Sequence, residues 1–210
     1  MKAPDSRLRI EPETLKLKEF PRDFFRKDTA VVARELVGSW IARLYDGQWY
    51  GARIVETEAY LGIGDAAAHS WKGRRTARVE PMYKDGGHLY VFLVYGMHHC
   101  ANIVTRTEGV PEAVLLRSAE GPPGALVKLL SGPGRLTTAL GITVSFSGMD
   151  LLSGGDIRVF SGNPDETRVD TGVSPRVGID YAGEAVLWPL RFFDRNSRAV
   201  SGPARLNKQY

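Results

Sequence analysis

The sequence predicts a single domain that combines α-helices and β-strands, and three observations support this prediction. The chain has 210 residues, which is enough for one well-packed core and short for two. Its composition, with 43% hydrophobic and 25% charged residues, is that of an ordinary globular protein. Two β-hairpins and several short helical patterns are recognisable, and no repeat or low-complexity tract interrupts them. We expect the domain to span residues 19–203, between an irregular N-terminal arm (residues 1–18) and a C-terminal tail (residues 204–210).

Cysteine content, apolar runs and charge restrict where such a protein works. The single cysteine, Cys100, excludes an intrachain disulfide, and no apolar run has the length of a signal-peptide core or of a membrane span. We therefore expect an intracellular protein without a membrane segment, near the nucleoid in the cytoplasm of a bacterium or in the nucleus of a eukaryote. The net charge of +4 favours polyanionic partners if the arginines cluster on one face.

The first helix and the first hairpin have clear sequence signals. Asp28 is a favourable N-cap, residues 30–37 form an amphipathic helical segment, and Gly38 ends it. Asp46-Gly47 supplies the positive φ angles that a tight turn needs between the two strands of residues 40–55. Further strands are predicted at residues 88–95, 99–105, 114–119 and 157–160, helices at residues 125–130 and 136–140, and small apolar segments that pack on the sheet at residues 176–179 and 187–193.

Residues 53–60, with the sequence Arg-Ile-Val-Glu-Thr-Glu-Ala-Tyr, combine strand-forming residues with groups that an ordinary core rejects. Side chains alternate along a strand, so Glu56, Glu58 and Tyr60 are predicted to share one face. Two carboxylates beside a phenol do not make a core, so this face is either open to water or part of a site. A glycine-rich turn follows and lets His69 approach Tyr60.

A basic segment, residues 71–78, directly follows this candidate site and contains four cations and no acid. One interpretation is a solvated loop, which is the usual meaning of an isolated basic run. The other is a segment that holds phosphates, with Arg74 and Arg78 as forked donors and Thr76 as a shorter one.

The second hairpin carries large side chains at its end. Its first strand, residues 88–95, places Tyr90 and Phe92 on one face. The segment Tyr95-Gly-Met-His98 then forms a projecting tip with a ring, a thioether and an imidazole. Bulky apolar groups at such a tip are costly unless something covers them.

Three kinds of chemistry are excluded by residue spacing. His98, His99 and Cys100 are adjacent, but neighbours on a strand point to opposite faces and the spacing of structural zinc ligands is absent, so we expect no metal. No nucleotide-binding glycine loop is present, so we expect no cofactor. An alternating strand pattern predicts that Cys100 is a buried, inert thiol and no nucleophile.

What remains is the carboxylate of Glu58 with aromatic rings available around it. A carboxylate can take a proton from water and direct the resulting oxygen at an electrophilic carbon. Flat aromatic walls suit a flat heterocycle, and a ring on a protruding turn suits a gap in stacked bases. Three alternatives stay open: a carbohydrate hydrolase with Glu56 and Glu58 as its carboxylate pair, a DNA-damage binding module without catalysis, and a structural Glu58 that is the buried salt-bridge partner of Arg117.

Collinear motifs extend from about residue 36 to residue 201. They include Arg53-Ile-Val-Glu-Thr-Glu-Ala-Tyr-Leu-Gly62, Ala67-Ala-His-Ser70, Tyr95-Gly-Met97, Val114-Leu-Leu-Arg117, Ser131-Gly-Pro133, Arg176-Val-Gly178 and Pro189-Leu-Arg-Phe192. Through these motifs the sequence closely resembles the alkyladenine (3-methyladenine, methylpurine) DNA glycosylase family of the mammalian type. The resemblance implies an α+β fold: a single compact domain around a curved, mainly antiparallel β-sheet, with a protruding β-hairpin and peripheral helices.

The resemblance also implies a role for each matching residue. Glu58 would be the general base that activates water for attack on C1′, and Arg117 with the main chain of Val177 would help hold this water. The implied base pocket consists of Tyr60, His69, Tyr90, Phe92, Asn102 and Val177, with Asn102 rejecting guanine. Tyr95 and Met97 would intercalate into DNA, and Arg74, Thr76, Arg78, His98 and Gly178 are expected to contact its backbone. Phe92 stands where the family usually has tyrosine, and His98 stands where it has another aromatic residue.

The implied activity is that of a monofunctional DNA glycosylase, which hydrolyses the N-glycosidic bond of alkylated or deaminated purines and leaves an abasic site. No lysine is placed as an obvious Schiff-base nucleophile, which favours simple hydrolysis. The expected partner is double-stranded DNA that contains damaged purines, and the protein is expected to act as a monomer without metal or cofactor. The alternative is a catalytically weak DNA-damage binding protein of the same fold.

Overall fold

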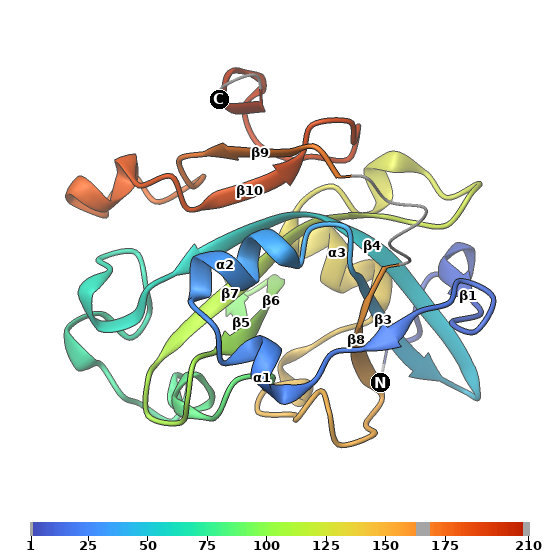
Figure 1. Ribbon diagram of the computed structural model, residues 1–210, viewed down its shortest axis with the longest axis horizontal. Helices are drawn as coiled ribbons and strands as arrows, with labels where there is room; N and C mark the ends of the chain where they lie inside the picture. Colours follow the sequence, from blue (N-terminus) through green and yellow to red (C-terminus); the bar gives the residue numbers. More distant parts are fainter. Residues whose placement is uncertain (1, 163–168, 208–210) are drawn as a thin grey trace.

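A curled antiparallel sheet forms the body of the protein in the computed structural model, which describes residues 2–162 and 169–207 (Figure 1). Within these residues the sheet has ten strands, and its main order is β2-β8-β3-β4-β7-β6-β5. Strands β1 and β10 pair directly with β4, and β9 pairs with β10. The strands are β1 (Arg9–Ile10), β2 (Lys18–Glu19), β3 (Trp40–Tyr45), β4 (Gln48–Tyr60), β5 (Leu89–Val94), β6 (His98–Thr105), β7 (Glu112–Glu120), β8 (Ile157–Ser161), β9 (Thr171–Ser174) and β10 (Arg191–Asp194).

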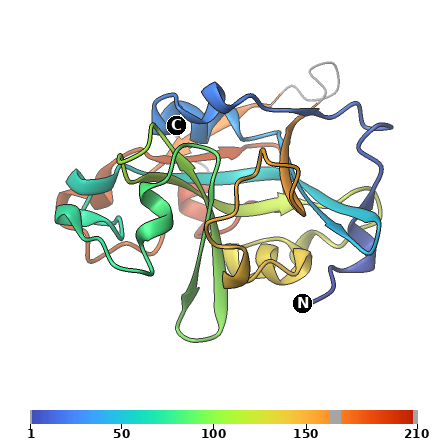
Figure 2. The same ribbon diagram turned by 90° about the horizontal axis from the view of Figure 1, so that it is seen from below.

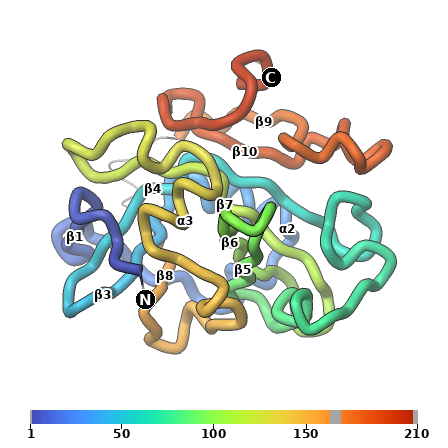
Figure 3. Tube along the Cα trace, turned by 180° about the vertical axis from the view of Figure 1, so that it is seen from behind, coloured from blue at the N-terminus to red at the C-terminus, as the bar shows by residue number. Residues whose placement is uncertain are grey.

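Three α-helices lie against this sheet in the described part of the chain. They are α1 (Arg22–Phe25), α2 (Thr29–Glu35) and α3 (Pro133–Leu140). As predicted, the carboxylate of Asp28 caps α2 by accepting the N–H groups of Ala30 and Val31. Helix α2 packs across β4, where the Thr57 hydroxyl donates to the carbonyl oxygen of Ala33 (2.7 Å), and α3 lies beside β6 (Figure 3). The predicted α+β fold with its curved, mainly antiparallel sheet is confirmed.

One hydrophobic core joins the sheet to both longer helices. Ile54 of β4 and Leu116 of β7 are fully buried in the same cluster as Val32 of α2 and Leu140 of α3. Burial of each large aliphatic side chain stabilises the fold by about 1.5–3 kcal/mol. The sheet and the helices therefore hold the polar residues of β4 and β7 in fixed positions.

Strand β4 changes its register against β7 where its polar residues lie. Glu56 pairs with Ser118 and the next residue, Thr57, pairs with Leu116, so Arg117 has no residue opposite it. Such irregularities re-aim side chains and are frequent next to active sites. The guanidinium of Arg117 can thus reach carboxylates on its own side of β4.

The β5–β6 hairpin projects from the body of the protein and is the green loop that extends furthest in Figure 2. Its turn has positive φ angles at Tyr95 (50°) and Gly96 (70°). The side chains of Tyr95 and Met97 are 89% and 72% exposed. The predicted projecting tip is therefore present, and it carries two uncovered apolar groups.

Two segments differ from their sequence-based description. The helix predicted at residues 125–130 is wrong, because the segment contains only the 3₁₀ turn Val127–Leu129. Leu126 and Val127 are exposed, so no buried apolar face offsets the cost of nucleating a helix in so short a segment. Residues 1–18, described as an irregular arm, bury Leu8 and Ile10 and pair through β1 with β4. Residue 1 of this arm and residues 208–210 of the expected tail lie outside the described residues.

Candidate active site

A cavity of about 550 Å³ lies at the end of β4, beside the projecting hairpin. Its walls come from the end of β4 and the loop that follows, from β5, β6 and β7, and from the segment after β9. The predicted site residues that line it are Tyr60, His69, Arg78, Tyr90, Phe92, Tyr95, Asn102, Arg117, Val177 and Gly178. Residues far apart in the sequence therefore meet at one place.

The carboxylate of Glu58 lies directly behind this wall and is fully buried. Its Oε1 accepts the N–H of Val177 (2.7 Å) and lies 3.3 Å from Nη1 of Arg117. Its Oε2 accepts the hydroxyl of Tyr60 (3.0 Å). These donors stabilise negative charge on a carboxylate, and all three residues line the cavity. Glu58 is thus held by three donors one layer beneath the cavity surface.

Arg117 joins the two carboxylates of β4. Its Nε donates to Oε1 of Glu56 (2.9 Å), while its Nη1 faces Glu58. Burial alone would lower the pKa of Arg117, but the carboxylates of Glu58 and Glu56 outweigh this effect and raise the pKa above its ordinary value. The guanidinium therefore keeps its charge at the cavity wall.

Glu56 is fully buried, and both oxygens of its carboxylate accept hydrogen bonds. Its carboxylate accepts hydrogen bonds from the guanidinium groups of Arg117 (2.9 Å) and Arg191 (2.6 Å). The Ser118 hydroxyl (2.8 Å) and the Ser201 N–H (2.7 Å) complete its shell. Burial alone would raise the pKa of Glu56, but the two cations and Ser201 lower it to about 2. Neither glutamate lines the cavity, but Glu56 is bound by two guanidinium groups, which argues against a carbohydrate hydrolase that needs it as a second carboxylate.

Aromatic rings form one wall of the cavity. Nδ1 of His69 lies 2.8 Å from the hydroxyl oxygen of Tyr90, and the ring centroids of His69 and Phe92 are 4.4 Å apart. Burial, together with the nearby cations Arg78 and Arg74, lowers the pKa of His69 to about 4. Burial raises the pKa of Tyr90 to about 12. Both rings are therefore uncharged at pH 7, which suits stacking against a flat heterocycle.

The sequence analysis missed a buried ion pair, Arg176 with Asp65, which packs against the ring of Tyr60. The guanidinium carbon of Arg176 lies 4.7 Å from the Tyr60 ring centroid, and its Nη2 donates to Oδ1 of Asp65 (2.8 Å). Arg176 also precedes Val177, whose N–H holds Glu58. A signal was available, because arginines inside short apolar segments, such as Arg176 and Arg191, must be paired when they are buried.

The predicted DNA-backbone residues surround the cavity but do not all enter it. Arg78 lines the cavity, with its guanidinium carbon 5.5 Å from the ring centroid of Phe92. Arg74 and Thr76 are exposed on the segment before it. His98 lies at the base of the hairpin tip and lines a second cavity instead.

The only cysteine of the chain lies in β6, next to the base cavity. Cys100 is buried, as predicted, and burial raises the pKa of its thiol to about 11. Within residues 2–162 and 169–207, no group of three or more His, Cys, Asp or Glu side chains could hold a metal ion. No helix in the same ranges is long and apolar enough to cross a bilayer.

The geometry defines a class of site, namely a cavity with aromatic walls and a buried, hydrogen-bonded carboxylate beneath it. The model of the methylpurine-DNA glycosylase (MPG) family matches residues 23–198 of the chain. The chain is 43% identical over 204 residues to a protein of Desulfitobacterium hafniense (strain Y51), with 88% of this chain and 99% of the relative covered. It is 44% identical over 187 residues to a protein of Bdellovibrio bacteriovorus, with 86% and 97% covered. Both relatives are named "Putative 3-methyladenine DNA glycosylase".

The chain therefore belongs to the methylpurine-DNA glycosylase family. This confirms the family predicted from the sequence motifs. It also places the protein among the DNA-repair hydrolases that cleave N-glycosidic bonds.

Proposed function

We propose that the protein is a monofunctional DNA glycosylase of base excision repair that flips alkylated or deaminated purines out of double-stranded DNA and leaves an abasic site. The proposed substrates are 3-methyladenine, 7-methylguanine, hypoxanthine and ethenoadenine. One observation carries the proposal: the Glu58 carboxylate is held by Val177, Tyr60 and Arg117 directly beneath a cavity with aromatic walls.

Glu58 acts in this proposal as a general base on water. The water oxygen forms a bond to C1′ as Glu58 takes its proton, and the N-glycosidic bond breaks with its electron pair leaving on the purine. The nucleotides of 3-methyladenine and 7-methylguanine already carry a positive charge, so these bases leave neutral without added protons, whereas neutral hypoxanthine and ethenoadenine need a proton delivered to the ring as they leave. Arg117 and Val177 are proposed to hold the water, and Glu58 needs little reorganisation because its donors already fix it. General-base catalysis of this kind contributes about 10²–10⁴-fold.

Tyr60, His69 and Phe92 are proposed to hold the flipped base, with His69 and Phe92 forming one wall together because their ring centroids are 4.4 Å apart. Stacking on aromatic side chains contributes about 1–3 kcal/mol per base. This gain offsets much of the few kcal/mol that extraction from the duplex costs, and damaged bases cost less to extract. Asn102 donates its amide to the carbonyl oxygen of Tyr90 (3.1 Å), which supports its proposed role of crowding the 2-amino group of guanine.

The exposed hairpin tip is proposed to fill the space that the flipped base leaves. Tyr95 would enter the duplex through the minor groove with Met97 beside it, and DNA would cover both apolar side chains. The proposed backbone contacts are Arg74, Thr76, Arg78, His98 and Gly178. The protein is proposed to do this as a monomer.

The proposed function is tested with the purified protein and matched duplexes that contain hypoxanthine, ethenoadenine, alkylated adenine or no lesion. We expect abasic sites in at least one lesion duplex, and strand breaks only after alkali treatment. Specific binding of lesion duplexes without any abasic sites would instead support the alternative, a catalytically weak DNA-damage binding protein.

Tyr95→Ser tests the wedge. We expect base release from a duplex to fall by roughly tenfold, because the stacking that it removes is worth about 1–3 kcal/mol. Release from a single-stranded oligonucleotide with the same lesion should change far less. Leu126→Ser is the matched control, since Leu126 is 61% exposed and lines neither cavity. Equal losses on both DNAs would contradict the wedge assignment.

A further inference from the structure

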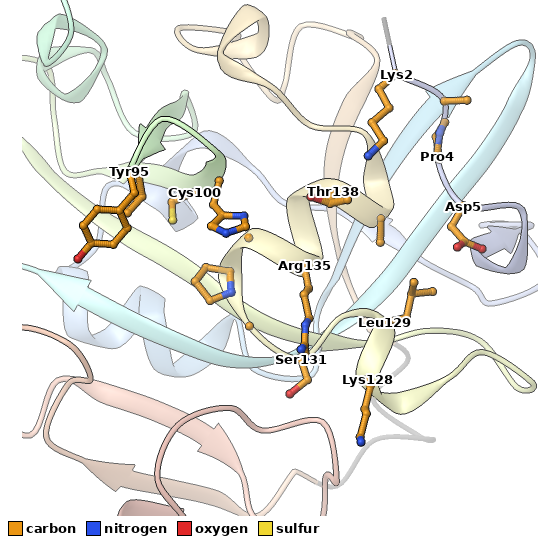
Figure 4. Close-up of a pocket in the computed structure, with 17 residues that line it drawn as sticks. Lys2, Pro4, Asp5, Tyr95, Cys100, Lys128, Leu129, Ser131, Arg135 and Thr138 are labelled. Carbon is orange, nitrogen blue, oxygen red and sulfur yellow. The ribbon is translucent and has the colours of Figure 1, made fainter.

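A second cavity, of about 980 Å³, lies on the other side of the hairpin tip (Figure 4). Val94, Tyr95, Cys100 and Pro133 line both cavities, so the hairpin stands between them. The rest of the second cavity is formed by α3, the turn before it and residues 2–5. The proposed reaction assigns no task to these elements.

Three cations line this second cavity: Lys2, Lys128 and Arg135. All three are exposed, and within the described residues none of them forms an ion pair with a carboxylate. Asp5 also lines the cavity, but its carboxylate accepts Nη2 (2.7 Å) and Nε (2.9 Å) of Arg7. Within the described residues the cavity therefore presents three cationic side chains that are not paired with a carboxylate.

The N-terminal wall of the cavity is fixed in place. The buried Arg43 donates through Nη1 to the main-chain oxygen of Lys2 (2.8 Å), and the N–H of Asp5 donates to the carbonyl oxygen of Ala139 in α3 (2.8 Å). These contacts use the main chain, so the Lys2 side chain remains available to the cavity. Lys2 thus belongs to a built wall.

The position of the second cavity beside the hairpin indicates which part of a DNA duplex could bind there. The two backbones of a duplex flank the minor groove, which is about 6 Å wide. If the damaged nucleotide enters the base cavity and Tyr95 enters the groove, the opposite strand must pass on the other side of the hairpin. Apolar lining groups such as Leu129 and Pro4 suit deoxyribose, and the cations suit phosphates.

We propose that the second cavity binds the sugar-phosphate backbone of the strand opposite the lesion, with Lys2, Lys128 and Arg135 at its phosphates. This inference rests on the proposed function and extends it, because the enzyme then binds both DNA strands, one on each side of Tyr95. The base cavity holds the damaged strand, and the second cavity holds its complement.

The test uses the full chain with the double variant K128A/R135A and the single variant K2A. All three residues are exposed, so the fold should not change. Base release is measured in single turnovers over a range of enzyme and salt concentrations. For a lesion duplex we expect the half-saturating concentration of the double variant to rise on the order of tenfold, and the slope of log affinity against log salt to fall by about one per lost phosphate contact. The maximal rate should stay the same.

Two comparisons decide the question. The variants should bind a single-stranded lesion oligonucleotide as the wild type does, and uncharged methylphosphonates in the opposite strand should weaken the wild type but not the double variant. Lys18→Ala is the control, because Lys18 is exposed on β2 and lines neither cavity. Equal weakening on single-stranded DNA, or equal methylphosphonate effects on both proteins, would overturn the inference. A wild type that releases no base from any lesion would overturn the proposed function instead.

Discussion

The surroundings of Glu56 and Glu58 differ, although the two residues lie close together on β4, are fully buried and share Arg117. The oxygens of Glu56 are enclosed by two guanidinium groups and two serines, and of these four donor residues only Arg117 lines the base cavity. Glu58 faces one cation and two uncharged donors, and all three donor residues line the base cavity. The difference separates a carboxylate that stabilises the fold from one that stands next to the space a substrate can enter.

Glu58→Gln has the largest expected effect, and it tests whether Glu58 differs from Glu56 in taking part in catalysis. Glutamine keeps the size of the side chain and can still accept the Val177 N–H, but a neutral amide cannot take a proton from water. We expect base release in single turnovers to fall on the order of 10²–10⁴-fold or more. Binding of lesion duplexes should remain largely intact. An equal loss of binding would show that Glu58 mainly serves as the structural partner of Arg117.

Glu56→Gln should produce the opposite pattern. The buried guanidinium of Arg191 then loses the carboxylate that accepts its Nε, and removal of one partner from a buried pair typically costs about 3–5 kcal/mol. Denaturant unfolding should show this loss, while base release per folded molecule should fall much less than in Glu58→Gln. The control is Glu19→Gln, whose exposed pair with Arg158 should contribute at most about 1 kcal/mol. A normally stable Glu56→Gln protein without activity would contradict the comparison.

Much of the base cavity could be predicted from the sequence because strand periodicity determines which side chains share a face. Tyr90 and Phe92 alternate along β5 and both line the cavity, as predicted. Tyr60 contacts Glu58, which agrees with their predicted common face. The Asp46-Gly47 turn and the Asp28 cap depend on local backbone preferences and were also predicted correctly.

The rest depends on contacts between distant segments. Arg117 reaches both glutamates because the register of β7 shifts against β4, and strand periodicity alone does not predict such a shift. The pairs Asp65 with Arg176 and Glu56 with Arg191 join residues more than a hundred positions apart. The sequence also places Glu58 on the face of a site, whereas the structure places its carboxylate one layer behind the cavity wall.

The smallest expected effect concerns the protonation of His69. The pKa of this ring tests whether the base cavity beside Glu58 excludes water. Burial, Arg78 and Arg74 lower the pKa of His69 from 6.5 to about 4, so its neutral form is favoured in the folded protein. The corresponding stability is present above pH 6.5 and is lost as the pH falls toward 4. We therefore expect the NMR signals of the His69 ring to stay constant from pH 8 to about pH 5.5, and base release not to be limited by this group in that range. Arg78→Ala should move the midpoint upward, while Lys18→Ala should not. A wild-type midpoint near 6.5 would mean that the ring is hydrated, and that the cavity beside Glu58 is less shielded than the cluster around Glu56.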